Sequence, residues 1–161
     1  VTYRGDAETR PVSKAILDDL RLLIRPELKR KKLKMDWRNT LDGDYPVSAL
    51  AVRQAVLNML LNACAAAPEG STVGLWAAVE ENELRINISD QGAGLPERFR
   101  TYLESASGAA PIQDNTGLGL WMIRRLADEM GGSIAVSQPP GGGTEVTLSV
   151  PLISEEVRRA A

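Results

Sequence analysis

The chain has 161 residues, of which 43% are hydrophobic and 25% charged, and its formal net charge is −2. These values predict a single globular domain, spanning residues 1–161, that is expected in the cytoplasm. The small negative charge gives no electrostatic reason to expect binding to nucleic acid or to a membrane surface, and no run of roughly 18 apolar residues suggests a membrane span. The chain has no histidine, which excludes serine–histidine triads and histidine metal sites.

The N-terminal third predicts a short strand, a helix and a second strand. Residues 9–12 have strand character, and Ser13 is a candidate cap for a helix whose apolar positions recur with helical spacing. Pro26 predicts a kink or a break near Arg25. The basic run Lys29 to Lys34 is interpreted as a solvated helix end, with docking of a partner as the alternative. A strand is predicted over residues 34–37.

The middle third predicts a long helix and a hairpin. The helix is expected to run from about Ser48 to Ala67, because Pro68 and Gly70 follow it. It is apolar on nearly every side, which indicates a buried helix, and its Cys64 is interpreted as a small core residue rather than a nucleophile. Two strands, over residues 72–79 and 84–89, are predicted on either side of the polar turn EENE.

The C-terminal third predicts a helix and a second hairpin after a long connection. Residues 95–116 contain one candidate helical turn, PERFRTYLE, and a connection of this length inside a domain predicts a mobile lid. A helix is expected over residues 117–130, followed by strands over 134–137 and 144–150. This order predicts an α+β sandwich of two layers, with a mixed, mostly antiparallel sheet packed on about three helices.

Three polar side chains interrupt the apolar central helix. Gln54, Asn58 and Asn62 are spaced four residues apart and therefore lie on one face. A solvent-facing edge is one interpretation. Buried amides without partners cost roughly 1 to 3 kcal/mol each, so the second interpretation is that the side-chain oxygens of the two asparagines face a hydrated divalent cation or phosphate oxygens.

The chain has two short glycine clusters. DQGAGL, at residues 90–95, follows a predicted strand, and TGLGL, at residues 116–120, opens a predicted helix. Neither has the GxGxxG or GxxxxGK[ST] pattern of the common phosphate loops. Gly92 and Gly94 permit turns that a Cβ atom would obstruct. Gly117 and Gly119 stand where helix N–H groups and the helix dipole favour phosphate.

Four motifs, LNMLLNACAAAP, ISDQGAGLP, NTGLGLWMIRRLADEMGG and GGGTEVTLSVPL, occur in an informative order. In order and spacing they resemble the catalytic ATP-binding domain of bacterial sensor histidine kinases, within the GHKL group and its Bergerat fold, over about residues 13–152. The resemblance implies ATP and Mg²⁺ as cofactors. It also implies a set of nucleotide-binding residues: Asn58, Asn62, Asp90, Gly92, Gly94, Gly117, Leu118, Gly119, Leu120 and Thr144.

Within this set the resemblance implies separate roles. Asp90 accepts a hydrogen bond from the adenine amino group, Thr144 supports adenine beside it, and the second glycine cluster holds the phosphates. Asn62 is the implied magnesium ligand, and Asn58 with Asn62 are the implied catalytic positions. Leu118 and Leu120 are interpreted as packing residues.

The resemblance also implies which chemistry follows. ATPases of the gyrase, Hsp90 and MutL types have a glutamate base where this chain has Asn58, and an amide cannot take a proton at neutral pH. Transfer of the γ-phosphate to a histidine is therefore expected. That histidine lies on a separate dimerisation and phosphoacceptor domain, and a response regulator acts downstream. The isolated domain is expected to be a monomer without direct membrane contact, although its parent protein can be membrane-anchored.

Two departures from the family pattern keep alternatives open. Ala65 stands where many sensor kinases have a basic residue, and the lid motif is poorly formed around Phe99, the only phenylalanine. Arg98, Arg100, Arg124 and Arg125 are candidates to supply the missing charge, although a solvated helix face is the preferred interpretation of Arg124 and Arg125. The alternatives are a serine kinase of the anti-sigma-factor type and a docking or nucleotide-binding pseudokinase.

Overall fold

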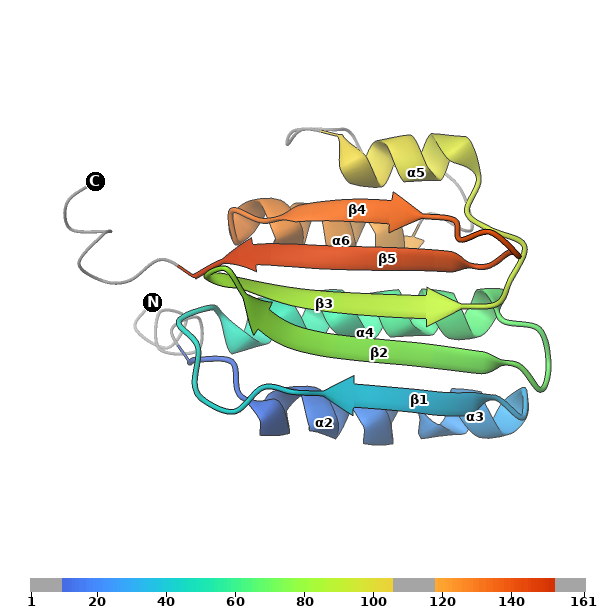
Figure 1. Cartoon of the computed structure of the whole chain (residues 1–161), viewed down its shortest axis with the longest axis horizontal. Coiled ribbons are helices and arrows are strands. Elements are labelled where there is room, and N and C mark those ends of the chain that lie inside the picture. The colour runs from blue at the N-terminus through green and yellow to red at the C-terminus, as the bar shows by residue number, and fades with distance from the viewer. Residues whose placement is uncertain (1–9, 106–117, 153–161) are drawn as a thin grey trace.

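The computed structural model describes residues 10–105 and 118–152, which form one five-stranded sheet with helices on one of its faces (Figure 1). The strands are β1 (Lys34–Asn39), β2 (Thr72–Glu80), β3 (Glu83–Asp90), β4 (Ser133–Ser137) and β5 (Thr144–Pro151). The helices are α2 (Lys14–Leu23), α3 (Arg25–Arg30), α4 (Ala49–Ala66), α5 (Glu97–Glu104) and α6 (Leu118–Glu129). The predicted two-layer α+β sandwich is confirmed.

The sheet has the strand order β1-β2-β3-β5-β4. β1 and β2 are parallel, joined by α4 as the crossover, and the other neighbouring strands are antiparallel. The register of β3 and β5 places Asp90, the last residue of β3, opposite Thr144, the first residue of β5. Two residues from distant parts of the sequence thus meet at one end of the sheet.

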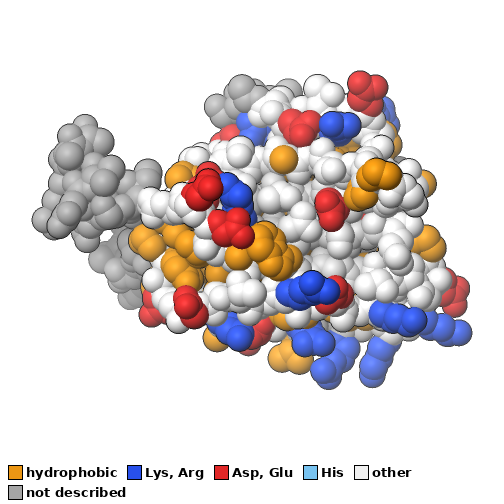
Figure 2. Space-filling view, viewed as in Figure 1, with side chains coloured by type: hydrophobic (Ala, Val, Ile, Leu, Met, Phe, Trp, Pro, Cys, Tyr) orange, Lys and Arg blue, Asp and Glu red, His pale blue; other side chains and the backbone are white. Residues whose placement is uncertain are grey.

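The core lies between the sheet and the layer formed by α2, α4 and α6. Alternate side chains of each strand face this layer, and Leu84, Ile86 and Leu148 are fully buried there. The other face of the sheet, which Figure 2 presents to the viewer, carries mostly polar and small side chains. This alternation is what an antiparallel sheet with one solvated face requires.

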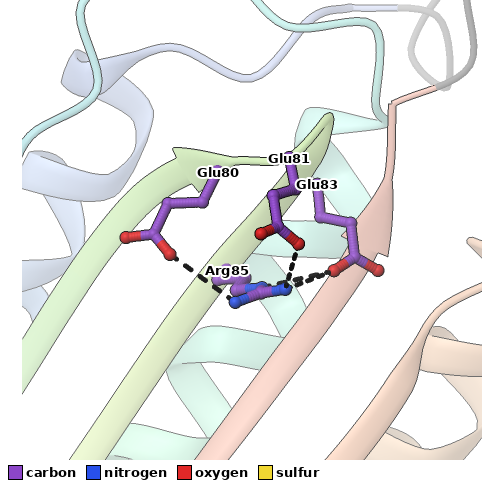
Figure 3. Close-up of polar contacts among 4 residues, drawn as sticks. All are labelled: Glu80, Glu81, Glu83 and Arg85. Carbon is purple, nitrogen blue, oxygen red and sulfur yellow. Dashed lines mark hydrogen bonds and ion pairs between the residues drawn. The ribbon is translucent and has the colours of Figure 1, made fainter.

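The β2–β3 hairpin turns through two residues in the left-handed region, Glu81 (φ 51) and Asn82 (φ 63). Such a two-residue turn matches the twist of the flanking strands. Figure 3 shows the Arg85 guanidinium among three glutamates, and the nearest is Glu83, whose Oε1 lies 2.9 Å from Nη2. The polar turn EENE is therefore confirmed. Its surface ion pairs add little stability because water screens them.

Helix α4 is the central helix of the core. The Ser48 hydroxyl oxygen accepts a hydrogen bond from the Ala51 N–H at 3.2 Å, and the Lys31 ammonium donates to the Cys64 and Ala65 carbonyls, each at 2.9 Å. One residue of the basic run thus caps this helix, while its neighbour Lys32 is exposed. The prediction that the basic run is a solvated end therefore holds only in part.

The prediction that α4 is a buried helix is confirmed for the face that packs in the core, but not for its whole circumference. Leu50 and Leu61 are 54% and 38% exposed, on the side that faces away from the sheet. By length and composition alone α4 is apolar enough to cross a membrane, although Arg53, Gln54 and Asn58 interrupt its apolar run. Here it packs against α6 and β3, as the core helix of a globular domain does.

The N-terminal elements differ from prediction in two details. The predicted break near Arg25 is confirmed, because α2 ends and α3 begins on either side of Ile24, and Pro26 lies in the first turn of α3. Ser13 occupies the N-cap position of α2, but its side chain makes no capping hydrogen bond. The predicted strand over residues 9–12 is reduced to a single antiparallel bridge between Val12 and Tyr45, and Thr9 lies outside the described residues.

The predicted lid begins with a packed helix rather than a single turn. Phe99 and Leu103 of α5 are buried, and α5 contacts β4 and α6. The rest of the predicted lid, residues 106–116, lies outside the described residues. A lid over those residues therefore stays a prediction.

Candidate functional site

A pocket of about 440 Å³ opens between α4, α6 and the ends of β3 and β5. Its floor is the inner face of the sheet, where Ile88 and Val146 lie, and α4 contributes Met59, Asn62 and Ala63. Asp90, Gly94, Gly119, Leu120 and Thr144 also line it. Of the ten residues predicted to bind nucleotide, six therefore meet around one cavity, although they span residues 62 to 144.

Asp90 lies half-buried at the end of β3. Its Oδ1 accepts a hydrogen bond from the Gly92 N–H at 2.8 Å, and within the described part of the chain Oδ2 has no partner. Burial raises the pKa of this carboxyl, and the Gly92 N–H opposes that rise. One oxygen is thus committed to the loop, and the other is left to accept from a ligand.

The loop after Asp90 is fixed by glycines in close contact with neighbouring backbone. A Cβ on Gly92 would lie 2.5 Å from the Ala66 carbonyl oxygen, and one on Gly143 would lie 2.4 Å from that of Asp90. The Gly143 N–H donates to the Gly92 carbonyl at 3.1 Å. Gly92 itself does not line the pocket, so it is needed for packing against the end of α4 and for holding Asp90.

Asn62 and the start of α6 meet on the opposite side of the pocket. A Cβ on Gly119 would lie 3.2 Å from Asn62 Nδ2 and 3.3 Å from its Oδ1. The Asn62 amide makes no hydrogen bond to any other described residue, although it is half-buried. A glycine at this point therefore lets the first turn of α6 approach a side-chain amide that is available to a ligand.

The remaining predicted positions are placed less directly. Asn58 lies half-buried one turn before Asn62 on α4, but it does not line the pocket. Gly117 lies outside the described residues. Leu118 begins α6, and Leu120 is buried while also forming part of the pocket wall. The packing role predicted for Leu120 is confirmed.

The pocket has a second wall that the sequence did not reveal. Leu95, Pro96, Phe99 and Leu103, from the segment predicted as a lid, line it. The sequence does contain an indication of this apolar helix face, because Phe99 and Leu103 are spaced four residues apart. The polar and charged residues between them obscured it.

None of the arginines proposed to replace the missing basic residue lines the pocket. Arg100 pairs with Glu104 and Arg125 with Glu129, at 3.5 and 3.4 Å. The interpretation of Arg124 as part of a solvated helix face is wrong, because Arg124 is buried and its Nη1 lies 2.7 Å from Asp128. Among the described lining residues, Asp90 alone carries a charge.

Cys64 lies in the core behind the pocket. Its side chain is buried, and burial raises the pKa of the thiol. A raised thiol pKa disfavours the reactive thiolate. The interpretation of Cys64 as a core residue is confirmed.

Comparison of the sequence with known proteins identifies relatives. The sequence profile of the family described as "Histidine kinase-, DNA gyrase B-, and HSP90-like ATPase" matches residues 48–154. The sensor protein GacS of Pseudomonas syringae pv. syringae is 31% identical over 152 residues, covering 85% of this chain and 16% of GacS. The histidine protein kinase DivJ of Caulobacter vibrioides is 34% identical over 117 residues, covering 69% of this chain and 20% of DivJ. The chain thus spans a fifth or less of these relatives.

Two of the solved structures that match this chain illustrate the shared fold. Full-length ShkA, crystallised in complex with AMPPNP, has a TM-score of 0.73 at 26% identity, covering 89% of this chain and 31% of ShkA. The catalytic domain of the histidine kinase ThkA has a TM-score of 0.73 at 18% identity, covering 88% of this chain and 94% of ThkA. The chain therefore belongs to the histidine kinase-, DNA gyrase B- and HSP90-like ATPase family, as a catalytic ATP-binding domain of the sensor histidine kinase type.

Proposed function

We propose that this domain binds Mg-ATP in the pocket and transfers the γ-phosphoryl group to a histidine on a separate phosphoacceptor and dimerisation domain, from which a response regulator then takes it. The observation that carries the proposal is the meeting of Asp90, Thr144, Asn62 and Gly119 around one cavity. The family and the curated sensor-kinase relatives support it.

Adenine is assigned to the end of the pocket formed by Asp90, Thr144 and Gly94. The ionised carboxylate accepts from the exocyclic amino group, and such a charge-assisted hydrogen bond contributes about 1.5 to 3 kcal/mol. Ile88 and Val146 provide an apolar surface for the ring. The nearby hydroxyl of Thr144 offers a second polar contact at the base.

The phosphates are assigned to the first turn of α6, where backbone N–H groups and the helix dipole favour anions. The Asn62 amide fits a magnesium ion, because its oxygen is a hard ligand, lines the pocket and has no partner among the described residues. Mg²⁺ in such sites takes few protein ligands and completes its coordination with phosphate oxygens and water. When bound, the ion would offset negative charge on the phosphates.

The chain's own residues position the nucleotide rather than supply a base. Asn58 and Asn62 are amides and accept no proton at neutral pH, so efficient hydrolysis of ATP is not expected. An incoming imidazole brings its own lone pair, and phosphoryl transfer depends mainly on alignment and charge compensation. Since the chain contains no histidine, the acceptor must come from another domain.

The transfer itself is tested by mixing this domain, γ-labelled ATP and a purified phosphoacceptor domain of a sensor kinase such as DivJ. We expect label on the acceptor that is lost in acid and kept in alkali, as for phosphohistidine, and none when the acceptor histidine is replaced. Acid-stable label on a serine of the acceptor would instead favour the anti-sigma-factor type of kinase. Binding of nucleotide without any transfer to several acceptors would favour a pseudokinase.

The metal assignment predicts the behaviour of Asn62→Ala. Calorimetric titration with AMPPNP, with and without Mg²⁺, is expected to show metal-enhanced binding for the wild type. In Asn62→Ala the two dissociation constants should become nearly equal, because the protein's contact to the ion is gone. Gln54→Ala, an exposed amide on the same helix, is the matched control and should keep the difference. An undiminished metal effect in Asn62→Ala would contradict the assignment.

A further inference from the structure

Residues 95–104 form a pocket wall that belongs to neither the sheet nor the layer of α2, α4 and α6. Leu95, Pro96, Phe99 and Leu103 face the cavity from this segment. In Figure 1 its helix, α5, lies along the free edge of β4 rather than over the face of the sheet. What holds this wall in place therefore affects the shape of the pocket.

Two side-chain hydrogen bonds fasten the segment to β4, one at each end. At its start, Gln138 Nε2, just beyond β4, donates to the Leu95 carbonyl at 3.0 Å. At its end, Glu104 Oε2 accepts from the Val136 N–H of β4 at 2.9 Å. The wall between these points has no backbone pairing to the sheet among the described residues.

The Glu104 carboxylate provides a hydrogen-bond acceptor for an N–H group of the edge strand β4. β4 pairs only with β5, so the outward N–H groups of β4 have no neighbouring strand. Val136 is buried, and a buried N–H without a partner is costly. A carboxylate is a strong acceptor for such a group, and the guanidinium of Arg100 lies 3.5 Å from the other oxygen of Glu104.

The Gln138 contact explains a glycine of the pocket. Gly94 has φ +101, and a Cβ there would lie 2.9 Å from Gln138 Nε2. The amide of Gln138 therefore lies directly against the loop that follows Asp90 while it bonds to the next residue, Leu95. Gly94 and Leu95 both line the pocket, whereas Gln138 does not.

We propose that Glu104 and Gln138 are positioning residues for nucleotide binding, which hold the wall formed by residues 95–104 against β4 without touching the ligand. The inference rests on the proposed nucleotide function and adds to it a determinant outside the family motifs. Loss of either bond leaves the cavity residues unchanged but lets one end of their wall move.

The test is titration of ADP with Mg²⁺ into the wild type and into Glu104→Ala, Glu104→Gln, Gln138→Ala and the double alanine variant. Each alanine variant should raise the dissociation constant by about 3- to 10-fold, the usual range for one lost hydrogen bond. Glu104→Gln keeps an acceptor oxygen and should restore most of the affinity. Amide exchange at Val136, followed by NMR, should quicken in Glu104→Ala and stay slow in Glu104→Gln.

Matched controls are Glu97→Ala, which removes the same charge from the same helix, and Gln54→Ala, an exposed amide far from β4. Both should bind ADP as the wild type does. Alanine variants that lower the melting temperature but keep wild-type affinity would overturn the proposal, as would an effect of Glu97→Ala equal to that of Glu104→Ala. Failure of the wild type to bind ADP would instead overturn the proposed function, so the two failures are distinguishable.

Discussion

Asp90→Asn should weaken the binding of ATP analogues about 10- to 150-fold, as expected for a lost charge-assisted hydrogen bond. The wild-type carboxylate offers Oδ1 to the Gly92 N–H and Oδ2 to the ligand. An asparagine has one oxygen and one NH₂ group. If its oxygen accepts from the Gly92 N–H, its NH₂ group faces the donor of the ligand, and the reverse orientation places NH₂ against the Gly92 N–H. Calorimetry with AMPPNP measures the effect.

The same variant should not destabilise the ligand-free domain. Because burial raises the pKa of Asp90 in the folded state, the residue favours folding when protonated, and this contribution is lost as the pH rises through that raised pKa. Asparagine is neutral at every pH and does not carry this cost of a buried negative charge. At pH 7 the free energy of unfolding of Asp90→Asn should therefore equal or exceed that of the wild type. Weakened binding together with a marked loss of stability would show that Asp90 acts through the fold.

Gly143→Ala should reduce the free energy of unfolding by about 2 to 4 kcal/mol and displace Asp90. Gly143 has φ +93, where L side chains are strained, and its Cβ would lie 2.4 Å from the Asp90 carbonyl oxygen. Since that contact is with backbone, the end of β3 must move to relieve it. Urea unfolding and AMPPNP titration should both report the change.

Gly141→Ala tests the effect of backbone strain without a steric clash. Gly141 lies in the same loop with φ +98, yet a Cβ there would meet nothing within 4 Å. It should therefore show only the conformational cost, about 1 to 2 kcal/mol, and keep nucleotide affinity. If Gly143→Ala and Gly141→Ala lose equal stability and bind nucleotide equally well, the loop relieves the clash by a local shift. The position of Asp90 would then not depend on Gly143.

The parts predicted correctly from sequence are those with a strong local signal. Alternation in β3, the proline at the α2–α3 break and the glycines after α6 each act within a few residues. The family resemblance also implied that Asp90 and Thr144 lie side by side, and the structure places the two residues opposite each other, at the end of β3 and the start of β5. Their direct opposition depends on the pairing of β3 with β5, which no local pattern specifies.

The failures concern tertiary contacts. Arg124 lies next to a second arginine, which favoured an exposed interpretation, but α6 packs against α4, α5 and β4, and Arg124 is buried in the fold. The mostly polar segment PERFRTYLE has weak helix signals, yet β4 and α6 cover its two apolar side chains, Phe99 and Leu103. Packing by distant segments decides such cases, and a single sequence does not record it.

The pairing of Asp90 with Thr144 has a consequence for how this domain can change over evolution. Side chains alternate along a strand, so a slip of one residue between β3 and β5 would turn Ile88 and Leu148 out of the core as well as moving Asp90 out of line. A chain that keeps this register therefore keeps Asp90 opposite Thr144, where we propose that adenine binds. Selection for a stable sheet therefore also preserves the alignment of these two positions, even where nucleotide binding itself is not under selection.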